Sequence, residues 1–435
     1  MAAGLAAAVC FSLTTIPVAA QATPTGPDAG LAASWIASQL VAAPGGGSAL
    51  PNGNDGIDWG TTIDAAFALA SAGVGSSQLQ AIGTALWNSG VAWIGDPAQS
   101  PSNWGSIGKL TLGLEVLGLD PATFPVNGAT IDLIASLRSA MTADGSFPNA
   151  SSYGQYSQAL AMLALARTSG GVPAQAVTWL EGQQCADATS PGFGSYGWSP
   201  DCSSPDPDVT SVSVQALEAA GVAETDPAVS AAVKWLAGQQ DASGGFASFG
   251  DLNANSTGLA AQTLQSATVT KAAAGFIGGL QITCATLADH PDSGLDANDV
   301  GAIVSDQPAF ASATTAGLTT VAGVVTVPTY TLMAATQAVL GLGGVGYASL
   351  SAAGAISDLP DRTCQASPDT TPTPTPSATP TQSATPTPTP SEGVSADTGG
   401  TAGPASGLPM LPGLAAVIAG LLIGAYFLRR PVKAR

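Results

Sequence analysis

Polar and aromatic side chains recur just before or at the start of alanine-rich segments. Their carboxyl, amide and hydroxyl groups and their rings could bind a ligand or take part in catalysis. The set comprises Asp58, Trp59, Thr62, Asp64, Trp104, Tyr153, Tyr156, Asp206, Asp208, Asn255 and Tyr330. The first turn of a helix favours anions and hydrogen-bond acceptors, and an aromatic face can hold an apolar or sugar ring. The set predicts a small-molecule binding site. The alternative is that the polar members only cap helices and the aromatic members only pack.

The chain offers little for catalysis. His290 is the only histidine, which excludes mechanisms that need several. Close carboxylate pairs, which glycan-cleaving enzymes require, are Asp55 with Asp58 and Asp296 with Asp299. A proline separates Asp206 from Asp208, which suits a loop cap better than a poised acid. We expect no catalytic residue and no cofactor.

The cysteines indicate an exported chain with disulfides. An even number remains once Cys10 is removed with a predicted signal peptide, as exported proteins favour. The four are Cys185, Cys202, Cys284 and Cys364. Of the three possible pairings we favour Cys185–Cys202, which closes a loop rich in Pro, Gly and Asp, with Cys284–Cys364 tying back the end of the domain.

Metal sites are the alternative use of these side chains. A zinc site would need CxxC spacing or more than one histidine, and the chain has neither. The loops 52–58 and 289–299 are rich in oxygen ligands, but neither matches the spacing of a calcium-binding EF-hand. Solvated, Asp-rich turns explain both loops, so we assign no metal.

Charge excludes nucleic acid as a partner. The formal net charge is -19, with 29 acidic and 10 basic residues, and only 6 of the bases precede residue 429. A nucleic-acid binder needs a basic footprint to displace counterions from phosphates.

The high Ala and Gly content with few lysines is typical of a high-GC actinobacterium.

The two ends predict a surface protein anchored in the plasma membrane. Residues 1–22 are uncharged and mostly apolar, as in a signal peptide. Residues 367–407 include a Pro/Thr/Ser tract, which predicts a disordered stalk. Leu408–Leu428 is uncharged and long enough to span a bilayer, and the basic tail 429–435 would stay in the cytoplasm. The ectodomain, 23–366, is then extracellular.

A pattern of two helices recurs about six times within 23–366. The best copies begin at Trp179 and Trp235, each followed by a Gly-aromatic turn and a second Ala-rich stretch at 209–222 or 256–269. Weaker copies have first helices at 35–39, 91–94, 133–137 and 276–281, and second helices at 61–74, 105–119, 156–167 and 329–342. Apolar residues recur every three or four places in these stretches, which predicts helices.

Caps and stacking follow from the same pattern. The predicted N-caps are Asp58, Asp208 and Asn255, and the predicted C-caps are Gly73, Gly221 and Gly341. A hairpin of two helices cannot bury its own faces, so the units must stack. Six units can close into a ring.

The WLxxQQ and GGF motifs of the two best copies resemble the repeats of the prenyltransferase and squalene-oxidase repeat superfamily. The resemblance covers 23–366 and is strongest at 175–265. It implies an all-α (α/α)6 toroid of six helical-hairpin repeats, in which Trp179, Gln184, Trp235 and Gln240 tie outer to inner helices. It further implies that the second helices are the inner ones, with their N-terminal ends at the mouth of a central cavity.

The enzymes of that superfamily carry motifs that this chain lacks. There is no DxDD motif as in squalene-type cyclases, no Asp/Cys/His zinc set as in protein prenyltransferases, and no GCGEQ thioester motif. We therefore expect a non-catalytic surface toroid that binds a small molecule, a glycan or a partner protein. The alternatives are a terpenoid- or prenyl-handling enzyme and a corrinoid-binding protein that resembles transcobalamin.

An insertion, 285–328, interrupts the last unit. It is the least repeat-like part of the ectodomain, and we expect an irregular segment that forms a lid, forms a partner surface or has no role of its own. Its Thr/Val-rich end predicts a short hairpin around Ala322 and Gly323.

Overall fold

The computed structural model describes residues 27–53, 56–97, 104–148, 154–199, 201–318 and 329–364. The predicted signal peptide, stalk, transmembrane helix, basic tail, Tyr153 and the hairpin around Ala322 lie outside these residues. Within them, no helix is both long and apolar enough to cross a bilayer.

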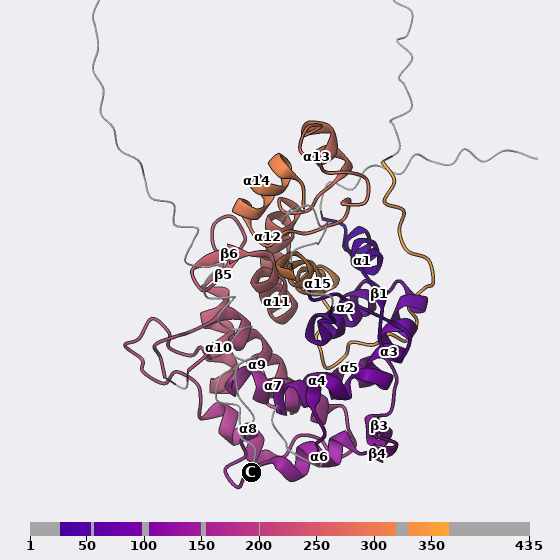
Figure 1. Cartoon of the computed structure of the whole chain (residues 1–435). Coiled ribbons are helices and arrows are strands. Elements are labelled where there is room, and N and C mark those ends of the chain that lie inside the picture. The colour runs from indigo at the N-terminus through magenta and orange to yellow at the C-terminus, as the bar shows by residue number, and fades with distance from the viewer. Residues whose placement is uncertain are drawn as a thin grey trace, which may run out of the picture. The chain divides into compact units, whose positions relative to one another are not determined.

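The fold is all-α, as predicted, apart from three two-stranded hairpins. Six helices correspond to the second helix of each unit: α2 (Trp59–Ala72), α5 (Trp104–Val116), α7 (Gly154–Ala166), α9 (Pro207–Ala219), α11 (Ala254–Leu264) and α15 (Thr329–Gly343). Each packs against the next in chain order, and α15 packs against α2 (Figure 1). The contacts among these six helices therefore form a closed cycle.

A second group of helices lies outside this cycle. They are α1 (Ala29–Ser38), α3 (Ser76–Ser89), α6 (Leu133–Ala140), α8 (Ala174–Glu181), α10 (Pro227–Ala237) and α12 (Ala267–Gly278). Each packs on one or two of the inner six; α1, for example, contacts both α2 and α15. The inner helices α2, α5, α7, α9 and α11 are buried along most of their length, because they pack on neighbours on several sides.

The remaining elements belong to neither group of helices. They are the helices α4 (Val91–Ile94), α13 (Cys284–Asp289) and α14 (Gln307–Ala316), and the 3-10 turn η1 (Pro121–Thr123). The antiparallel hairpins pair β1 (Val41–Ala42) with β2 (Ser48–Ala49), β3 (Phe124–Val126) with β4 (Ala129–Ile131), and β5 (Phe246–Ser248) with β6 (Asp251–Asn253).

Two predicted helix positions are wrong. The first helix of the second unit is α3, not 91–94, which forms only the four-residue α4. The stretch 256–269 is not one helix, because α11 ends at Leu264, Gln265 takes a left-handed backbone conformation and α12 starts at Ala267. The inner helix α11 and the outer helix α12 are therefore joined by only two residues, Gln265 and Ser266.

Several predicted caps also shift. Asp58 and Gly73 cap α2 as predicted. The N-caps of α9 and α11 are Asp206 and Asn253, two residues before Asp208 and Asn255. Gly221 follows Ala220, the C-cap of α9. Gly341 lies inside α15, where it faces Gly258 of α11 so closely that a Cβ on either residue would clash. Gly341 is therefore a packing residue and not a helix end.

The repeat is marked by one glycine in the turn after five of the six outer helices, α1, α6, α8, α10 and α12. Each has a positive φ, and a Cβ on it would clash with the backbone of the next outer helix. These glycines are Gly47, Gly145, Gly194, Gly244 and Gly301, which face α3, α8, α10, α12 and α1. The described part of the insertion, 285–318, therefore includes a regular turn of the repeat as well as α13 and α14, and it is not irregular as expected.

Glutamine side chains join consecutive outer helices at the same turns. Gln184 Nε2 donates to the Ala228 carbonyl at the start of α10, and Gln240 Nε2 to the Val269 carbonyl in α12. Gln281 accepts from Asp28 N–H at 2.9 Å and donates to Asp28 O at 3.0 Å, which joins the last unit to the first. The motif glutamines thus link outer helix to outer helix, rather than outer to inner.

We expect Gln281→Ala to lower the free energy of unfolding by about 1–3 kcal/mol, because it leaves the part-buried N–H of Asp28 without its partner and removes one of the two hydrogen bonds to the Asp28 carbonyl. Urea unfolding of the variant and of the native chain measures the difference. Gln80→Ala is the matched control, since Gln80 is exposed on α3. Equal midpoints for Gln281→Ala and the native chain would show that this link is dispensable.

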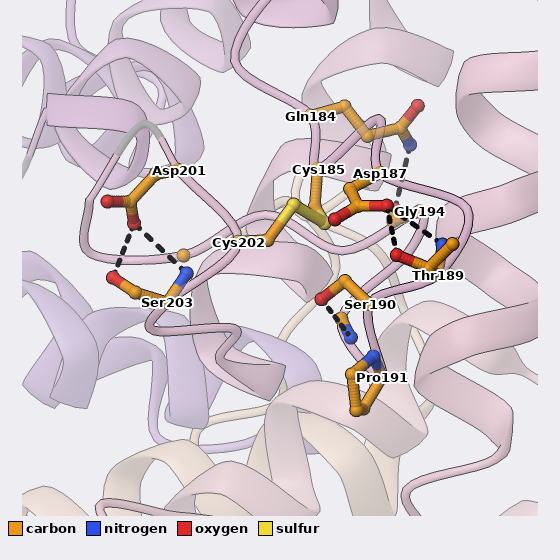
Figure 2. The surroundings of a disulfide bond; sticks show 12 residues. Gln184, Cys185, Asp187, Thr189, Ser190, Pro191, Gly194, Asp201, Cys202 and Ser203 are labelled. Atoms are coloured by element: carbon orange, nitrogen blue, oxygen red, sulfur yellow. Dashed lines mark hydrogen bonds between the residues drawn. A yellow bond between two sulfur atoms is a disulfide. The ribbon is translucent and has the colours of Figure 1, made fainter.

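The predicted disulfides are confirmed. Cys185 is bonded to Cys202 and Cys284 to Cys364, with Cα–Cα distances of 4.9 and 5.4 Å. Figure 2 shows the first bond between turns in which Asp187 accepts from Thr189 and Asp201 from Ser203. The short loop that this bond closes is thus held by its own side chains as well.

The segment 344–364, called here the C-terminal strap, crosses the C-terminal ends of several inner helices. Its Ala352 N–H donates to Val116 O at the end of α5, and its Ile356 N–H donates to Gly73 O at the end of α2. Near its end, Pro360 O accepts from Ser34 of α1. The strap then reaches the disulfide at Cys364.

Candidate binding site

Polar side chains from different inner helices gather in the interior. We call this set the central polar cluster: Asp64 of α2, Lys109 of α5, Tyr156 of α7, Asp208 of α9, Gln337 of α15 and Tyr347 of the strap. Asp64 pairs with Lys109 at 2.7 Å, and Gln337 Nε2 lies 3.4 Å from the other oxygen of Asp64. The side chain of Lys109 is 15% exposed and that of Asp64 5%. This is a buried ion pair with an added hydrogen bond, as such pairs need.

The charges that act on the two tyrosines show that the members of the cluster lie close together. Burial raises the pKa of Tyr156 well above its usual value, and the charges of Asp64, Asp208 and Asp206 raise it further. Burial does the same for Tyr347, together with Tyr156, Asp64 and Asp208. Both phenols therefore stay protonated in the physiological range and can donate a hydrogen bond, but they do not act as bases.

Asp206 and Asp208, called here the acid pair, begin α9. Asp206 caps the helix by accepting from the N–H groups of Asp208 and Val209. Its other oxygen accepts from Ser248 Oγ of β5 at 2.6 Å. Both oxygens of Asp206 thus have partners, and its side chain is 3% exposed.

Asp208 is buried without such partners. Its Oδ1 makes no hydrogen bond to the described residues. Burial raises its pKa to about 8, and the charge of Asp206 adds to this effect. The Ser256 hydroxyl lowers the pKa by facing the carboxyl, although the contact falls short of hydrogen-bond geometry. A buried carboxyl group without a partner is costly, and such groups concentrate at functional sites.

An aromatic stack runs beside the acid pair. It consists of Tyr156, Trp198 and Phe249, with ring centroids 5.7 Å apart at the first step and 5.8 Å at the second, and interplanar angles of 26° and 20°. Trp198 comes from the loop that the Cys185–Cys202 disulfide closes, and Phe249 from the turn between β5 and β6. Phe249 is 81% exposed, so the stack reaches from the central polar cluster to solvent.

The structure divides the predicted site residues into two groups. Asp64, Tyr156, Asp206 and Asp208 come together as described above. Asp58 uses its carboxylate on Thr61, and Trp59 and Trp104 are buried. Asn255 is half-buried in the first turn of α11, and Tyr330 is 54% exposed at the start of α15. No hydrogen bond or ion pair links Asp58, Trp59, Trp104, Asn255 or Tyr330 to the cluster.

Thr62 has a scaffold role that recurs in other units. Its hydroxyl accepts from Leu50 N–H and donates to Asp58 O, which joins the preceding turn to α2. Equivalent bonds to turn N–H groups are made by Gln158, Thr210 and Thr257. We therefore do not place Thr62 in the candidate site.

Sequence reasoning missed Lys109, Trp198, Phe249, Gln337 and Tyr347. Lys109 carried a usable signal, because it is the one positive charge in the mostly apolar segment 105–119. Trp198 also carried one, since it lies in a loop already predicted to be closed by a disulfide. The other three are brought to the site only by tertiary packing.

Two surface hollows lie elsewhere. One, of about 640 Å³, is lined by α3 and by strap residues including Ser351 and Ala352. The other, of about 660 Å³, is lined by Glu115 and Arg167 among others. Burial raises the pKa of Glu115 to about 7, which the charge of Arg167 partly offsets. Neither hollow is lined by the central polar cluster or by the aromatic stack.

Metal ligation finds no support in the part of the chain that the structure describes. It holds no group of three or more His, Cys, Asp or Glu side chains arranged to bind an ion. In the loop 289–299, Asp296 and Asp299 accept from backbone N–H groups of the same turn.

Comparisons with known proteins add no relative: no protein-family model matches the chain, and no curated protein is similar to it in sequence.

Proposed function

We propose that residues 23–366 form an (α/α)6 toroid that binds a small molecule between its central polar cluster and its aromatic stack, without catalysis. The closed cycle of contacts among six inner helices supports the toroid. The link between Gln281 and Asp28 supports it as well, because it joins the last outer turn to the first. The superfamily resemblance of the motifs agrees with this fold.

The observation that carries the function is the buried Asp208 carboxyl beside a stack of rings that opens to solvent. Binding sites combine aromatic faces with a few convergent polar groups, and this site has both. A terpenoid-handling enzyme would instead need an apolar cavity around an isolated acid. Here Asp208 lies beside Asp206, Ser256 and Tyr156, which favours a binding protein.

We propose that this binding takes place at the cell surface. The apolar segment Leu408–Leu428, the basic tail after it and the Pro/Thr/Ser tract before it support a single-pass anchor and a stalk. The two disulfides support an ectodomain on the oxidising side of the membrane.

We expect the chain purified from membranes of its native host to carry a bound mass, seen in native but not in denaturing mass spectra. Trp198→Ala should reduce the occupied fraction about tenfold or more, because it removes the middle of the stack. Phe193→Ala is the control, since Phe193 is an exposed ring in the same loop but outside the stack. A bare polypeptide mass for the native chain would count against small-molecule binding.

A further inference from the structure

The exposed end of the aromatic stack is held in a backbone conformation that phenylalanine rarely adopts. Phe249 has φ 53, in the left-handed region, and Gly250 after it has φ 94. The turn that joins β5 to β6 thus has two consecutive positive φ values, a geometry that favours Asn or Gly at both positions. A strained and exposed aromatic residue is costly to folding, which is the pattern expected where function requires the side chain.

Both ends of the stack are tied to the acid pair. Tyr156, at the inner end, lies near enough for the charges of Asp208 and Asp206 to act on its phenol. Phe249, at the outer end, follows Ser248, whose hydroxyl donates to Asp206. The rings and the carboxyl groups therefore belong to one local site.

The acid pair has no positive charge paired with it among the described residues, since Lys109 of the central polar cluster pairs with Asp64. Among the described residues, the ion pairs are Asp64 with Lys109 and Glu115 with Arg167, so neither member of the acid pair has a cationic partner. A neutral ligand would leave the negative charge of these two carboxyl groups uncompensated. A cation would supply the missing charge to the carboxyl groups and would interact with the ring faces as well.

We propose that the acid pair and the aromatic stack bind an organic ammonium cation, with its charge near Asp206 and Asp208 and its alkyl groups against the rings. This proposal rests on the proposed function, because it names the class of ligand for the same site. The charge of the cation and its alkyl groups are bound by different residues. Asp208 supplies the free carboxyl oxygen, and Phe249 supplies the exposed ring face.

The test is calorimetric titration of the full-length chain, in detergent, with choline chloride as the probe. Its neutral isostere dimethylbutanol, in which carbon replaces nitrogen, is the matched ligand, and cellobiose is a neutral sugar. Titrations are run above pH 8, where the Asp208 carboxyl is ionised, and sodium chloride keeps the ionic strength constant. We expect saturable binding of choline, at least about tenfold tighter than that of dimethylbutanol.

Two variants separate the roles of charge and ring. Asp208→Asn and Phe249→Gly should each weaken choline binding about tenfold or more, and Phe193→Ala should leave it unchanged. Glycine suits the left-handed backbone at position 249, so Phe249→Gly should fold at least as well as the native chain. Thermal unfolding of each variant checks this, and a loss of binding in a stable Phe249→Gly then reports on the ring itself.

The other outcomes overturn the proposal in distinguishable ways. Equal binding of choline and dimethylbutanol, or binding of cellobiose alone, would refute the cation while leaving a small-molecule site intact. Choline binding that survives both Asp208→Asn and Phe249→Gly would refute the location. A chain that binds none of the three probes, and that carries no bound mass from its host, would refute the proposed function as well.

Discussion

Replacing Asp208 by asparagine should stabilise the protein at pH 8 and above, and should change its stability little near pH 4. In the folded chain burial raises the pKa of this carboxyl from 3.8 to about 8, and the Asp206 charge adds to the effect. The folded state therefore keeps a proton between about pH 4 and pH 8 that the unfolded chain has released. Because the unfolded state binds fewer protons in this window, the free energy of unfolding falls as pH rises.

The size of this effect follows from the same values. A rise in pKa from 3.8 to about 8 corresponds to about 6 kcal/mol of stability lost between the two ends of the window. Asparagine has nearly the shape of the protonated acid and does not ionise, so Asp208→Asn removes this loss. The variant should therefore gain on the native chain steadily from about pH 4 to about pH 8.

Denaturant unfolding at several pH values across this window measures the difference between the two chains. Asp132→Asn is the matched control, because Asp132 also begins a helix, α6, but is exposed to solvent. Parallel stability curves for Asp208→Asn and the native chain would mean that Asp208 is ionised in the fold at neutral pH. The charge of the candidate site would then be present over the whole physiological range.

The sequence predicts the helices well where apolar spacing and a tryptophan mark them. The segments around Trp179 and Trp235 form α8 and α10 and repeat the same glutamine contacts. The helix α3 was missed although Leu79, Ile82 and Leu86 follow helical spacing, because its segment, 76–89, has no copy of the WLxxQQ motif. Trp93 resembles the motif tryptophans, and for this reason the first helix of the unit was predicted at 91–94 instead.

The candidate site is harder to predict, because its parts meet only in three dimensions. Asp64, Tyr156 and Asp208 were found because each lies in the first turns of an inner helix. Trp198 and Phe249 lie in turns whose local sequence says nothing about a shared stack. An aromatic residue before a glycine is typical of a turn, and only the fold brings it to a ring more than forty positions away in the chain.

Removal of the Cys284–Cys364 disulfide, in the double variant Cys284→Ser, Cys364→Ser, should cost about 4–5 kcal/mol of unfolding free energy. The bond closes a loop with a sequence separation of 80, and the entropy that it removes from the unfolded chain grows with loop length. The second pair, Cys185→Ser, Cys202→Ser, closes a separation of only 17 and should cost about 3 kcal/mol. Denaturant unfolding of both double variants compares the two directly.

The two bonds should differ in binding as well as in stability. Loss of Cys185–Cys202 frees the loop that carries Trp198, so it should weaken ligand binding even under conditions in which the chain stays folded. Loss of Cys284–Cys364 frees the end of the strap, whose Tyr347 fills the interior beside Phe67 with ring centroids 5.3 Å apart. The strap keeps its bonds to α2 and α5, so the folded fraction of this variant should still bind. A variant without Cys185–Cys202 that bound normally would show that the other contacts of the loop suffice to hold the stack.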